Sequence, residues 1–219
     1  MIIVYDKGEE DIALGIEEGG KYSAESLILA RYYMFLQVYF HKVRRAYDKH
    51  LSQFLKQYFM QYFKREHYPS EVEEFLKYDD NLIMSFMYKS LTNKDECSYY
   101  ANIIINRKHY QTLFESSDFC KLKEVKYFKQ CCEKLEKKFP KVDILIDSAI
   151  DAPNKFSKDA FYVKLLKPKG IDYDSKYDDI DMVSDIITKL KNIEKFRVYV
   201  PEEKFDDIKK ISDKLAWKP

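Results

Sequence analysis

The sequence predicts a mainly α-helical fold, with an N-terminal β-hairpin, a helical bundle portion and a small C-terminal α+β unit. Glycine occurs at only five positions, four of them within the first twenty residues, and Pro69 is the single proline between residues 20 and 140. Because helices tolerate glycine and proline least, most of the chain is free to be helical. The 219 residues are 46% apolar and include 19 tyrosines and 15 phenylalanines, so a sizeable core is expected.

Composition and charge exclude several classes of protein. The net charge of +1 gives no overall basic field of the kind that binds nucleic acid. No run of 18 apolar residues occurs, so no membrane-spanning helix is expected. The first residues turn acidic within six positions and lack a long apolar run, so we expect no signal peptide and a cytoplasmic protein.

The four cysteines are expected to be reduced thiols, because no secretion signal precedes them. They are Cys97, Cys120, Cys131 and Cys132. The four histidines lie far along the sequence from the adjacent cysteine pair and from each other. We therefore predict no metal site in this chain.

Residues 1–20 predict the hairpin that leads into the fold. Residues 2–5 and 11–16 are two β-prone runs, and residues 7–10, which include a glycine, form the turn between them. The pair Gly19-Gly20 then breaks the chain before the first helix.

Residues 21–117 predict the helical region. Ser23 is a candidate N-cap for a long helical stretch from about residue 24 to 66, with a break expected near residues 50–52 because so long a helix is unusual. Three further helix starts are expected: at Ser70 in a capping box with Glu73, at a short turn and cap formed by Asp79-Asp80-Asn81, and at Asn93. These short, aromatic-rich helices are typical of a bundle around one core.

Residues 118–219 predict the small α+β unit. Its expected elements are a helix at 125–139, strands at 142–146 and 161–166, a helix at 179–190, a strand at 196–200 and a last helix beginning at Pro201. The resulting order of helices and strands is typical of a small α+β domain.

The segment ARYYMFLQVYFHKVRR at residues 30–45 carries the strongest chemical signal. On one helix, four of its side chains would fall along one side, at positions i, i+4, i+8 and i+11: Arg31, Phe35, Tyr39 and Lys42. His41 and Arg45 flank this row, at i+10 and i+14. Two cationic side chains and a histidine beside a tyrosine ring can hold a polyphosphate and its sugar. A basic amphipathic helix with solvated charges and buried aromatic rings gives the same pattern, so spacing alone leaves both interpretations open.

The same segment, extended to ARYYMFLQVYFHKVRRAY, closely resembles the helix that follows the metal site in HD-domain phosphohydrolases. This is the family of the deoxynucleoside triphosphate triphosphohydrolases. The hairpin with AESLILARYYM resembles the lead-in of that family, and FLKYDDNLIMSFM at residues 75–87 resembles its next helix pair. Asn106-Arg107-Lys108 resembles the short motif that follows, and the C-terminal unit resembles the family more loosely. The resemblance covers nearly the whole chain.

The resemblance implies roles for four residues of the 30–45 segment. Arg31 and Lys42 match positions that contact substrate phosphates. Tyr39 matches a tyrosine that packs on the deoxyribose, and His41 lies in the same pocket wall.

The resemblance also implies a role for Arg107, which matches an arginine that helps to bind an allosteric nucleotide between subunits. Here the sequence departs from the pattern of the activator-regulated members. Glu17 and Glu18 occupy a stretch where those members carry basic activator-binding residues, so control by a nucleotide activator is not expected.

The metal ligands of the family have no counterpart in this sequence. The family needs a divalent metal held by a histidine, a His-Asp pair and a further aspartate, and this chain contains no His-Asp dipeptide. Those ligands precede the hairpin in the family, so the chain resembles the downstream portion of the enzyme, without a catalytic residue. Lacking the HD helices, Phe35, Tyr39 and Phe40 are expected to face water and to mark an interaction surface. The expected partner is an HD-bearing polypeptide or a second copy of the chain.

Two functions stay open at this stage. The chain either supplies phosphate and sugar contacts to a nucleotide phosphohydrolase whose metal lies on an HD-bearing polypeptide, or it is a catalytically inactive interaction or regulatory protein. The second would bind a protein, a nucleotide or nucleic acid, and the net charge of +6 over residues 21–67 permits the last of these.

Overall fold

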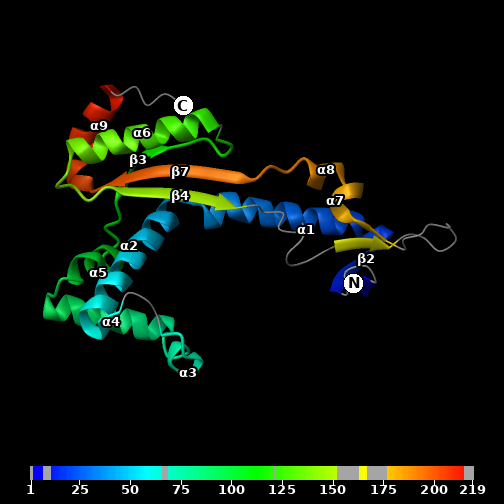
Figure 1. Cartoon of the computed structure of the whole chain (residues 1–219), viewed down its shortest axis with the longest axis horizontal. Helices are drawn as coiled ribbons and strands as arrows, with labels where there is room; N and C mark the ends of the chain where they lie inside the picture. The colour runs from blue at the N-terminus through cyan, green and yellow to red at the C-terminus, as the bar shows by residue number, and fades with distance from the viewer. Residues whose placement is uncertain are drawn as a thin grey trace. The chain divides into compact units, whose positions relative to one another are not determined.

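The computed structural model describes residues 2–6, 11–65, 69–120, 122–151, 163–166 and 177–214. The described chain is mainly α-helical, as the sequence predicts (Figure 1). It divides into two compact units, each assembled from separate stretches of the chain. Unit 1 comprises Met1–Phe40, Ser117–Cys120 and Ala149–Lys195, and unit 2 comprises His41–Ser116, Lys121–Ser148 and Phe196–Pro219.

The sheet of unit 1 begins with the predicted hairpin, whose turn at residues 7–10 lies outside the described residues. Strand β1 (Ile2–Asp6) pairs antiparallel with β2 (Asp11–Glu17), which confirms the hairpin. Strand β5 (Val163–Leu166) then pairs parallel with β2, and β6 (Tyr177–Asp179) pairs antiparallel with β5. The strand predicted at 161–166, of which residues 161 and 162 lie outside the described residues, therefore extends the N-terminal hairpin.

The helices of unit 1 pack their apolar sides on each other. They are the single 3-10 turn η1 (Glu18–Gly20), α1 (Lys21–Met34), the π-helical turn η2 (Phe35–Tyr39), α7 (Ile180–Val183) and α8 (Asp185–Thr188). Ala24 and Ile28 of α1 form a buried cluster with Ile180 and Ile187. Gly20 is required at the start of α1, because a Cβ there would lie 2.6 Å from Cγ2 of Ile16.

Two details of these helices differ from the sequence-based expectation. Helix α1 begins at Lys21, directly after the 3-10 turn, so Ser23 lies inside the helix and is not its N-cap. The helix predicted at 179–190 is divided at Ser184, whose backbone is extended and whose hydroxyl accepts a hydrogen bond from the Ile187 N–H (3.3 Å). Ser184 therefore caps α8 as a separate helix.

The helix predicted over residues 24–66 is broken at Phe40–His41, and the break expected at 50–52 was wrong. Phe40 leaves the helical region with φ −102° and ψ 15°, and His41 is extended with φ −62° and ψ 132°. Helix α2 (Lys42–Tyr58) runs without interruption through residues 50–52. It is continuous there because His50 and Phe54, one turn apart, are both fully buried in the core of unit 2.

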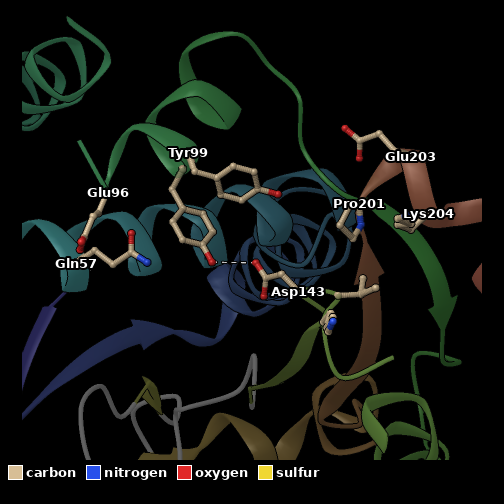
Figure 2. Close-up of a pocket in the computed structure, with 10 residues that line it drawn as sticks. Gln57, Glu96, Tyr99, Asp143, Pro201, Glu203 and Lys204 are labelled. Atoms are coloured by element: carbon tan, nitrogen blue, oxygen red, sulfur yellow. Dashed lines mark hydrogen bonds between the residues drawn. The ribbon is translucent and has the colours of Figure 1, made fainter. Parts of the chain in front are cut away.

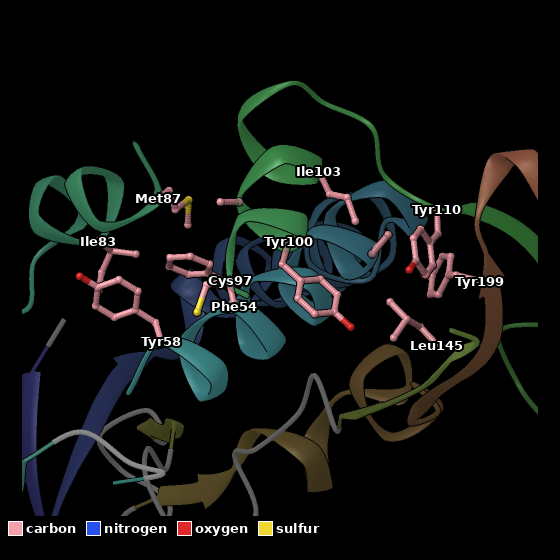
Figure 3. Close-up of a cluster of buried hydrophobic side chains, with 12 residues drawn as sticks. Phe54, Tyr58, Ile83, Met87, Cys97, Tyr100, Ile103, Tyr110, Leu145 and Tyr199 are labelled. Carbon is pink, nitrogen blue, oxygen red and sulfur yellow. The ribbon is translucent and has the colours of Figure 1, made fainter. Parts of the chain in front are cut away.

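Unit 2 contains the helical bundle around α2. Its other helices are the π-helical turn η3 (Phe59–Phe63), α3 (Val72–Phe75), α4 (Asp80–Asn93) and α5 (Ser98–Ile105). Figure 3 shows the core between α2, α4 and α5, where Phe54, Tyr58, Ile83, Met87 and Tyr100 converge.

The predicted helix caps of this bundle meet different outcomes. The cap predicted within residues 79–81 is confirmed and is Asp79, since its Oδ1 accepts from the Leu82 N–H at 2.8 Å. Ser70 does not cap α3, which begins at Val72 after Glu71 with no side-chain cap. Asn93 was wrong as a start, because it ends α4.

The end of α4 has its own physical cause. Lys94 adopts a left-handed conformation with φ 52°, which terminates the helix. Asp95 then accepts from the Cys97 N–H (2.9 Å) and from the Tyr62 hydroxyl (2.6 Å), so the chain turns before α5 begins at Ser98.

A three-stranded sheet completes unit 2. Its strands lie in the order β3 (Gln111–Glu115), β7 (Ile193–Val200) and β4 (Leu145–Asp151), and β3 runs antiparallel to β7. The first residues of β7 and the last residues of β4 belong to unit 1. No strand was predicted at 111–115, whereas β4 and β7 lie close to the predicted strands.

The helices α6 (Leu122–Lys138) and α9 (Phe205–Lys214) accompany this sheet (Figure 1). Phe128 of α6 packs on Phe114 and Phe196 with ring centroids 5.6 and 5.3 Å apart, which seats α6 on β3 and β7. A 3-10 turn, η4 (Glu202–Lys204), follows Pro201, so the proline precedes this turn and not α9 itself.

Candidate functional site

Arg31 and Tyr39 lie in unit 1, on either side of Phe35. The guanidinium carbon of Arg31 lies 5.3 Å from the centroid of the Phe35 ring, a cation–π contact. The Tyr39 ring meets the Phe35 ring edge-on, with centroids 4.9 Å apart. Arg31 is exposed and Tyr39 is half-buried, so the structure brings a cationic head and a phenol ring together around one phenylalanine.

The aromatic side chains expected to face water were wrongly assigned to the surface. Phe35 is 8% exposed and Phe40 is 6% exposed, because both pack with Tyr32, Ala149 and Ile193 in a core cluster of unit 1. The π-helical turn places these rings inward. The exposed apolar residues of this segment lie instead on the opposite side of α1 and η2.

His41 and Lys42 lie in unit 2, at the start of α2. His41 is the last residue before the helix and Lys42 is its first, and both side chains are exposed. The Lys42 carbonyl accepts a hydrogen bond from the buried Tyr199 hydroxyl at 3.0 Å, which fixes the helix start on β7. The backbone of Lys42 is therefore held in place, while its side chain is exposed.

The expected helical row of Arg31, Phe35, Tyr39 and Lys42 needs a correction. Their spacing of i, i+4, i+8 and i+11 describes an uninterrupted α-helix, whereas a π-helical turn and the extended His41 interrupt this one. Arg31 and Tyr39 belong to one unit, and His41 and Lys42 belong to the other. The four residues therefore form two pairs, one in each unit, and the nucleotide contacts that the resemblance implies for them stay a prediction.

Arg45, the last residue of the sequence segment, is held by a buried carboxylate. Its Nε and one terminal nitrogen donate to the two carboxylate oxygens of Asp147 at 2.9 and 2.5 Å, and Asp147 is fully buried. The Lys49 ammonium lies 3.5 Å from the same carboxylate. The hydrogen bonds to Asp147 raise the pKa of Arg45 against the opposing effect of burial. Arg45 therefore links α2 to β4, and its guanidinium is engaged in the hydrogen bonds to Asp147.

Arg107 lies at a groove of about 800 Å³ in unit 2, lined by residues of α2, α4 and α5. It is exposed and left-handed (φ 55°), in a turn where the Lys108 N–H bonds the Ile103 carbonyl at 2.8 Å. His109 lines the same groove and meets the Tyr47 ring edge-on, with centroids 5.3 Å apart. Most of the lining residues are apolar, and the charged or polar ones are Arg107, His109, Asp48 and Asp80.

Three tyrosines and an aspartate form a second polar cluster, which no sequence motif predicts. The hydroxyls of Tyr100 and Tyr110 both donate to Oδ2 of Asp143 at 2.8 Å, and the Tyr99 and Tyr110 hydroxyls lie 2.9 Å apart. Burial, and then these hydrogen bonds, raise the pKa of Tyr100 and Tyr110. Tyr99, Tyr100 and Asp143 line a hollow of about 480 Å³ in unit 2 (Figure 2).

The four cysteines are free thiols, and three of them are buried. Burial raises the pKa of Cys97 to about 11 and that of Cys132 to about 12, so neither is a nucleophile near neutral pH. Among the described residues, no three His, Cys, Asp or Glu side chains gather so that they could hold a metal ion.

No helix in the described part of the chain combines the length and the apolar character that crossing a bilayer demands.

Residues 5–216 match the family described as the HD associated region. The chain belongs to this family. The expected relation to HD-domain proteins is thus confirmed, whereas the triphosphohydrolase activity stays a prediction. A search of curated proteins finds no match for this HD-associated chain.

Two solved structures share the fold of the HD-associated chain. A hypothetical protein from Aquifex aeolicus has a TM-score of 0.69 and 22% identity, over 95% of this chain and 48% of that chain. A phosphohydrolase from Bacteroides thetaiotaomicron has a TM-score of 0.55 and 18% identity, over 89% of this chain and 53% of that chain. The HD-associated chain spans about half the length of each.

Proposed function

We propose that this HD-associated chain is the non-catalytic component of a metal-dependent nucleotide phosphohydrolase. It supplies phosphate and sugar contacts to a deoxynucleoside triphosphate, while an HD-bearing polypeptide holds the divalent metal that activates water. The family match over residues 5–216 carries this proposal, and the phosphohydrolase among the structural neighbours supports it.

This proposal assigns nucleotide contacts to four exposed or half-buried side chains, two in each unit: Arg31 and Tyr39 in unit 1, and His41 and Lys42 in unit 2. The Arg31 guanidinium offers a planar fork of donors to phosphate oxygens, and Lys42 offers a point charge. His41 lies directly before Lys42, and Tyr39 offers a ring face for the sugar. The exposure of Arg31, His41 and Lys42 supports these roles. Arg45, by contrast, is bound to Asp147.

Nucleotide binding by the chain alone is the first test. We expect calorimetric titration in the presence of Mg²⁺ to show that at least one of the four deoxynucleoside triphosphates binds. Arg31→Ala and Lys42→Ala should each weaken binding about tenfold or more, because a hydrogen bond to a charged group contributes about 1.5–3 kcal/mol. Lys56→Ala removes an exposed lysine of the same helix α2 and is the matched control. Equal losses in all three variants would contradict a specific site.

Turnover is the second test. The chain alone should release neither phosphate nor triphosphate from deoxynucleoside triphosphates with Mg²⁺ or Mn²⁺. Adding a purified HD-bearing polypeptide encoded in the same genome should produce turnover, and Arg31→Ala should reduce it. Robust turnover by the chain alone would overturn the assignment of the metal to a partner.

The alternative is a catalytically inactive interaction protein. One observation favours it: α1 and η2 expose an almost uncharged surface of the kind that binds proteins. This alternative predicts a protein complex that forms without nucleotide binding and without turnover.

A further inference from the structure

The hollow of about 480 Å³ beside α5 is built from unit 2 alone. It lies among the first residues of α5, the end of α2, the segment before β4 and the turn η4. Figure 2 shows Tyr99 on one side of it and Glu203 and Lys204 of η4 on the other. We call it the Tyr99 hollow, and its other lining residues are Gln57, Glu96, Tyr100, Lys141, Val142, Asp143 and Pro201.

The hydrogen bonds of the three tyrosines at this hollow run in one direction. An ionised carboxylate only accepts, so the hydroxyls of Tyr100 and Tyr110 each donate their hydrogen to Oδ2 of Asp143, at 2.8 Å. The Tyr110 hydroxyl has no second hydrogen, so the Tyr99 hydroxyl is the donor in the 2.9 Å bond between these two. All three phenolic hydrogens are therefore committed within the cluster.

This direction is fixed before any ligand arrives. Tyr100 and Tyr110 are buried, and burial followed by hydrogen bonding raises the pKa of both hydroxyls, so they stay protonated near neutral pH. The backbone N–H of Tyr110 also donates to Nε2 of the fully buried His50 at 3.4 Å, which holds Tyr110 against α2.

The cluster offers acceptors to a ligand. The Tyr99 oxygen donates its hydrogen to Tyr110 and still has acceptor capacity, and a chain of hydrogen bonds polarises each oxygen along it. Asp143 receives both tyrosine hydroxyls on Oδ2, so Oδ1 has acceptor capacity too. The Tyr99 side chain is 50% exposed, and a tyrosine ring face attracts a cation. A cation with N–H donors satisfies all of these groups.

Two lysines, Lys141 and Lys204, also line the hollow, and both are exposed. An exposed lysine carries its charge on a long flexible stem that extends into water. Asp143, by contrast, is held in place by two tyrosine hydroxyls. The two lysines are also outnumbered by the carboxylates of the lining, which belong to Glu96, Asp143 and Glu203.

We infer that the Tyr99 hollow binds an organic cation with N–H donors, which is a primary ammonium or guanidinium group. The cation lies against the Tyr99 ring and donates to the Tyr99 oxygen and to the Asp143 carboxylate. A free polyamine and the arginine side chain of a protein share this chemistry. The inference concerns unit 2 alone and does not depend on the proposed function.

The test is an NMR titration of the full chain that observes the signals of the probe. The probes are spermidine and a Gly-Arg-Gly peptide with blocked ends, and we expect at least one of them to saturate the chain below about 10 mM. Tetramethylammonium carries the same charge as a primary ammonium group but no N–H, so it should bind at least about tenfold more weakly.

Two variants with matched controls locate the binding. Tyr99→Phe keeps the ring and removes the oxygen, so it should weaken binding at least about fivefold. Its control is Tyr88→Phe, because Tyr88 is 55% exposed and does not line the hollow. Asp143→Asn removes the negative charge and should weaken binding at least about tenfold. Its control is Glu202→Gln, which removes the same charge from an exposed residue outside the lining.

Each control should change the affinity less than about twofold, and circular dichroism should show all four variants folded. Tighter binding of spermidine assigns the hollow to a free polyamine, and tighter binding of the peptide assigns it to an arginine side chain. Failure of both probes to saturate, equal binding of tetramethylammonium, or equal losses in variants and controls overturns the inference. Saturation by inorganic phosphate in place of the cations would assign the hollow to its lysines and overturn it as well.

Discussion

Helices α1 and α2 follow each other in the sequence but differ on their exposed sides. The exposed residues of α1 and η2 include one charge, whereas three of the five exposed residues between Lys42 and Tyr58 are lysine or arginine. The net charge of +6 over residues 21–67 accordingly divides into +1 for residues 21–40 and +5 for residues 41–67. An average over the segment therefore hides two surfaces, one suited to protein contact and one suited to anions.

The buried sides of the two helices differ as well. Helix α1 is held by small apolar clusters and by the buried Glu25, which accepts a hydrogen bond from the Ser184 hydroxyl at 2.6 Å. Helix α2 is held by the ion pair of Arg45 with Asp147 and by the buried His50. The difference teaches that α2, whose exposed side is basic, depends on a buried polar anchor, whereas α1 depends mainly on apolar packing.

Removing this anchor is the change with the largest expected effect. Arg45→Ala leaves the fully buried Asp147 carboxylate with only the more distant Lys49, and loss of one partner of a buried ion pair costs about 3–5 kcal/mol. Urea denaturation followed by far-ultraviolet circular dichroism measures the free energy of unfolding. Arg44→Ala is the control, because the exposed pair of Arg44 with Asp48 (3.7 Å) contributes less than about 1 kcal/mol. Similar losses in both variants would contradict the special status of Arg45.

The buried His50 makes the stability of unit 2 depend on pH. Burial lowers the pKa of His50 to about 4, from 6.5 in the unfolded chain. Between these values the unfolded chain binds a proton that the folded chain does not, so stability is full above pH 6.5 and falls as the pH drops toward 4. The loss from this group amounts to about 3 kcal/mol.

Denaturation at pH 7 and pH 4.5 measures this dependence, and His50→Phe should reduce it. His41→Ala is the control, because His41 is exposed at the start of the same helix. If the free energy of unfolding changes as much between pH 7 and pH 4.5 in His50→Phe as in the unsubstituted chain, His50 is not the source of the pH dependence.

A smaller effect is expected on the α1 side. Ser184→Ala removes the cap of α8 and the hydroxyl that donates to Glu25, so we expect a loss of about 1–2 kcal/mol in the free energy of unfolding. Ser26→Ala is the control, because the Ser26 hydroxyl bonds its own helix at an exposed site. A neutral Ser184→Ala would mean that Glu25 finds another donor.

The smallest effect is expected on the exposed side of α1, at Leu27. Leu27→Lys should change the free energy of unfolding of the isolated chain by less than about 0.5 kcal/mol, because exposed substitutions without buried contacts are nearly neutral. Denaturation and solubility measurements check this. A loss above about 1 kcal/mol would show that the exposed side of α1 already packs within the chain.

Much of the fold could be predicted because its signals are local. The hairpin follows from two β-prone runs, and the Asp79 cap follows from its place directly before an apolar helix. The break at Phe40–His41 has no glycine or proline to mark it. It depends on partners far away in the sequence, Asp147 for Arg45 and Tyr199 for Lys42, and a single sequence does not display such contacts.

The residues of the candidate sites show the same contrast between local and long-range signals. Arg31, Tyr39, His41 and Lys42 were found because their side chains share one dense segment. The cluster of Tyr99, Tyr110 and Asp143 escaped notice, because its members lie on separate segments with no motif. Strand β3 was missed since its β-structure comes from pairing with β7, some eighty residues later.

The pairing of β2 with β5 has a consequence for synthesis of the chain. Leu14 lies opposite Val163, so the hairpin leaves the ribosome long before its third strand. At ordinary elongation rates the β2 edge waits roughly ten to thirty seconds with its hydrogen-bonding groups unpaired. During this interval an open edge is a template for pairing with other chains. The nascent hairpin is therefore the segment for which chaperone protection matters most.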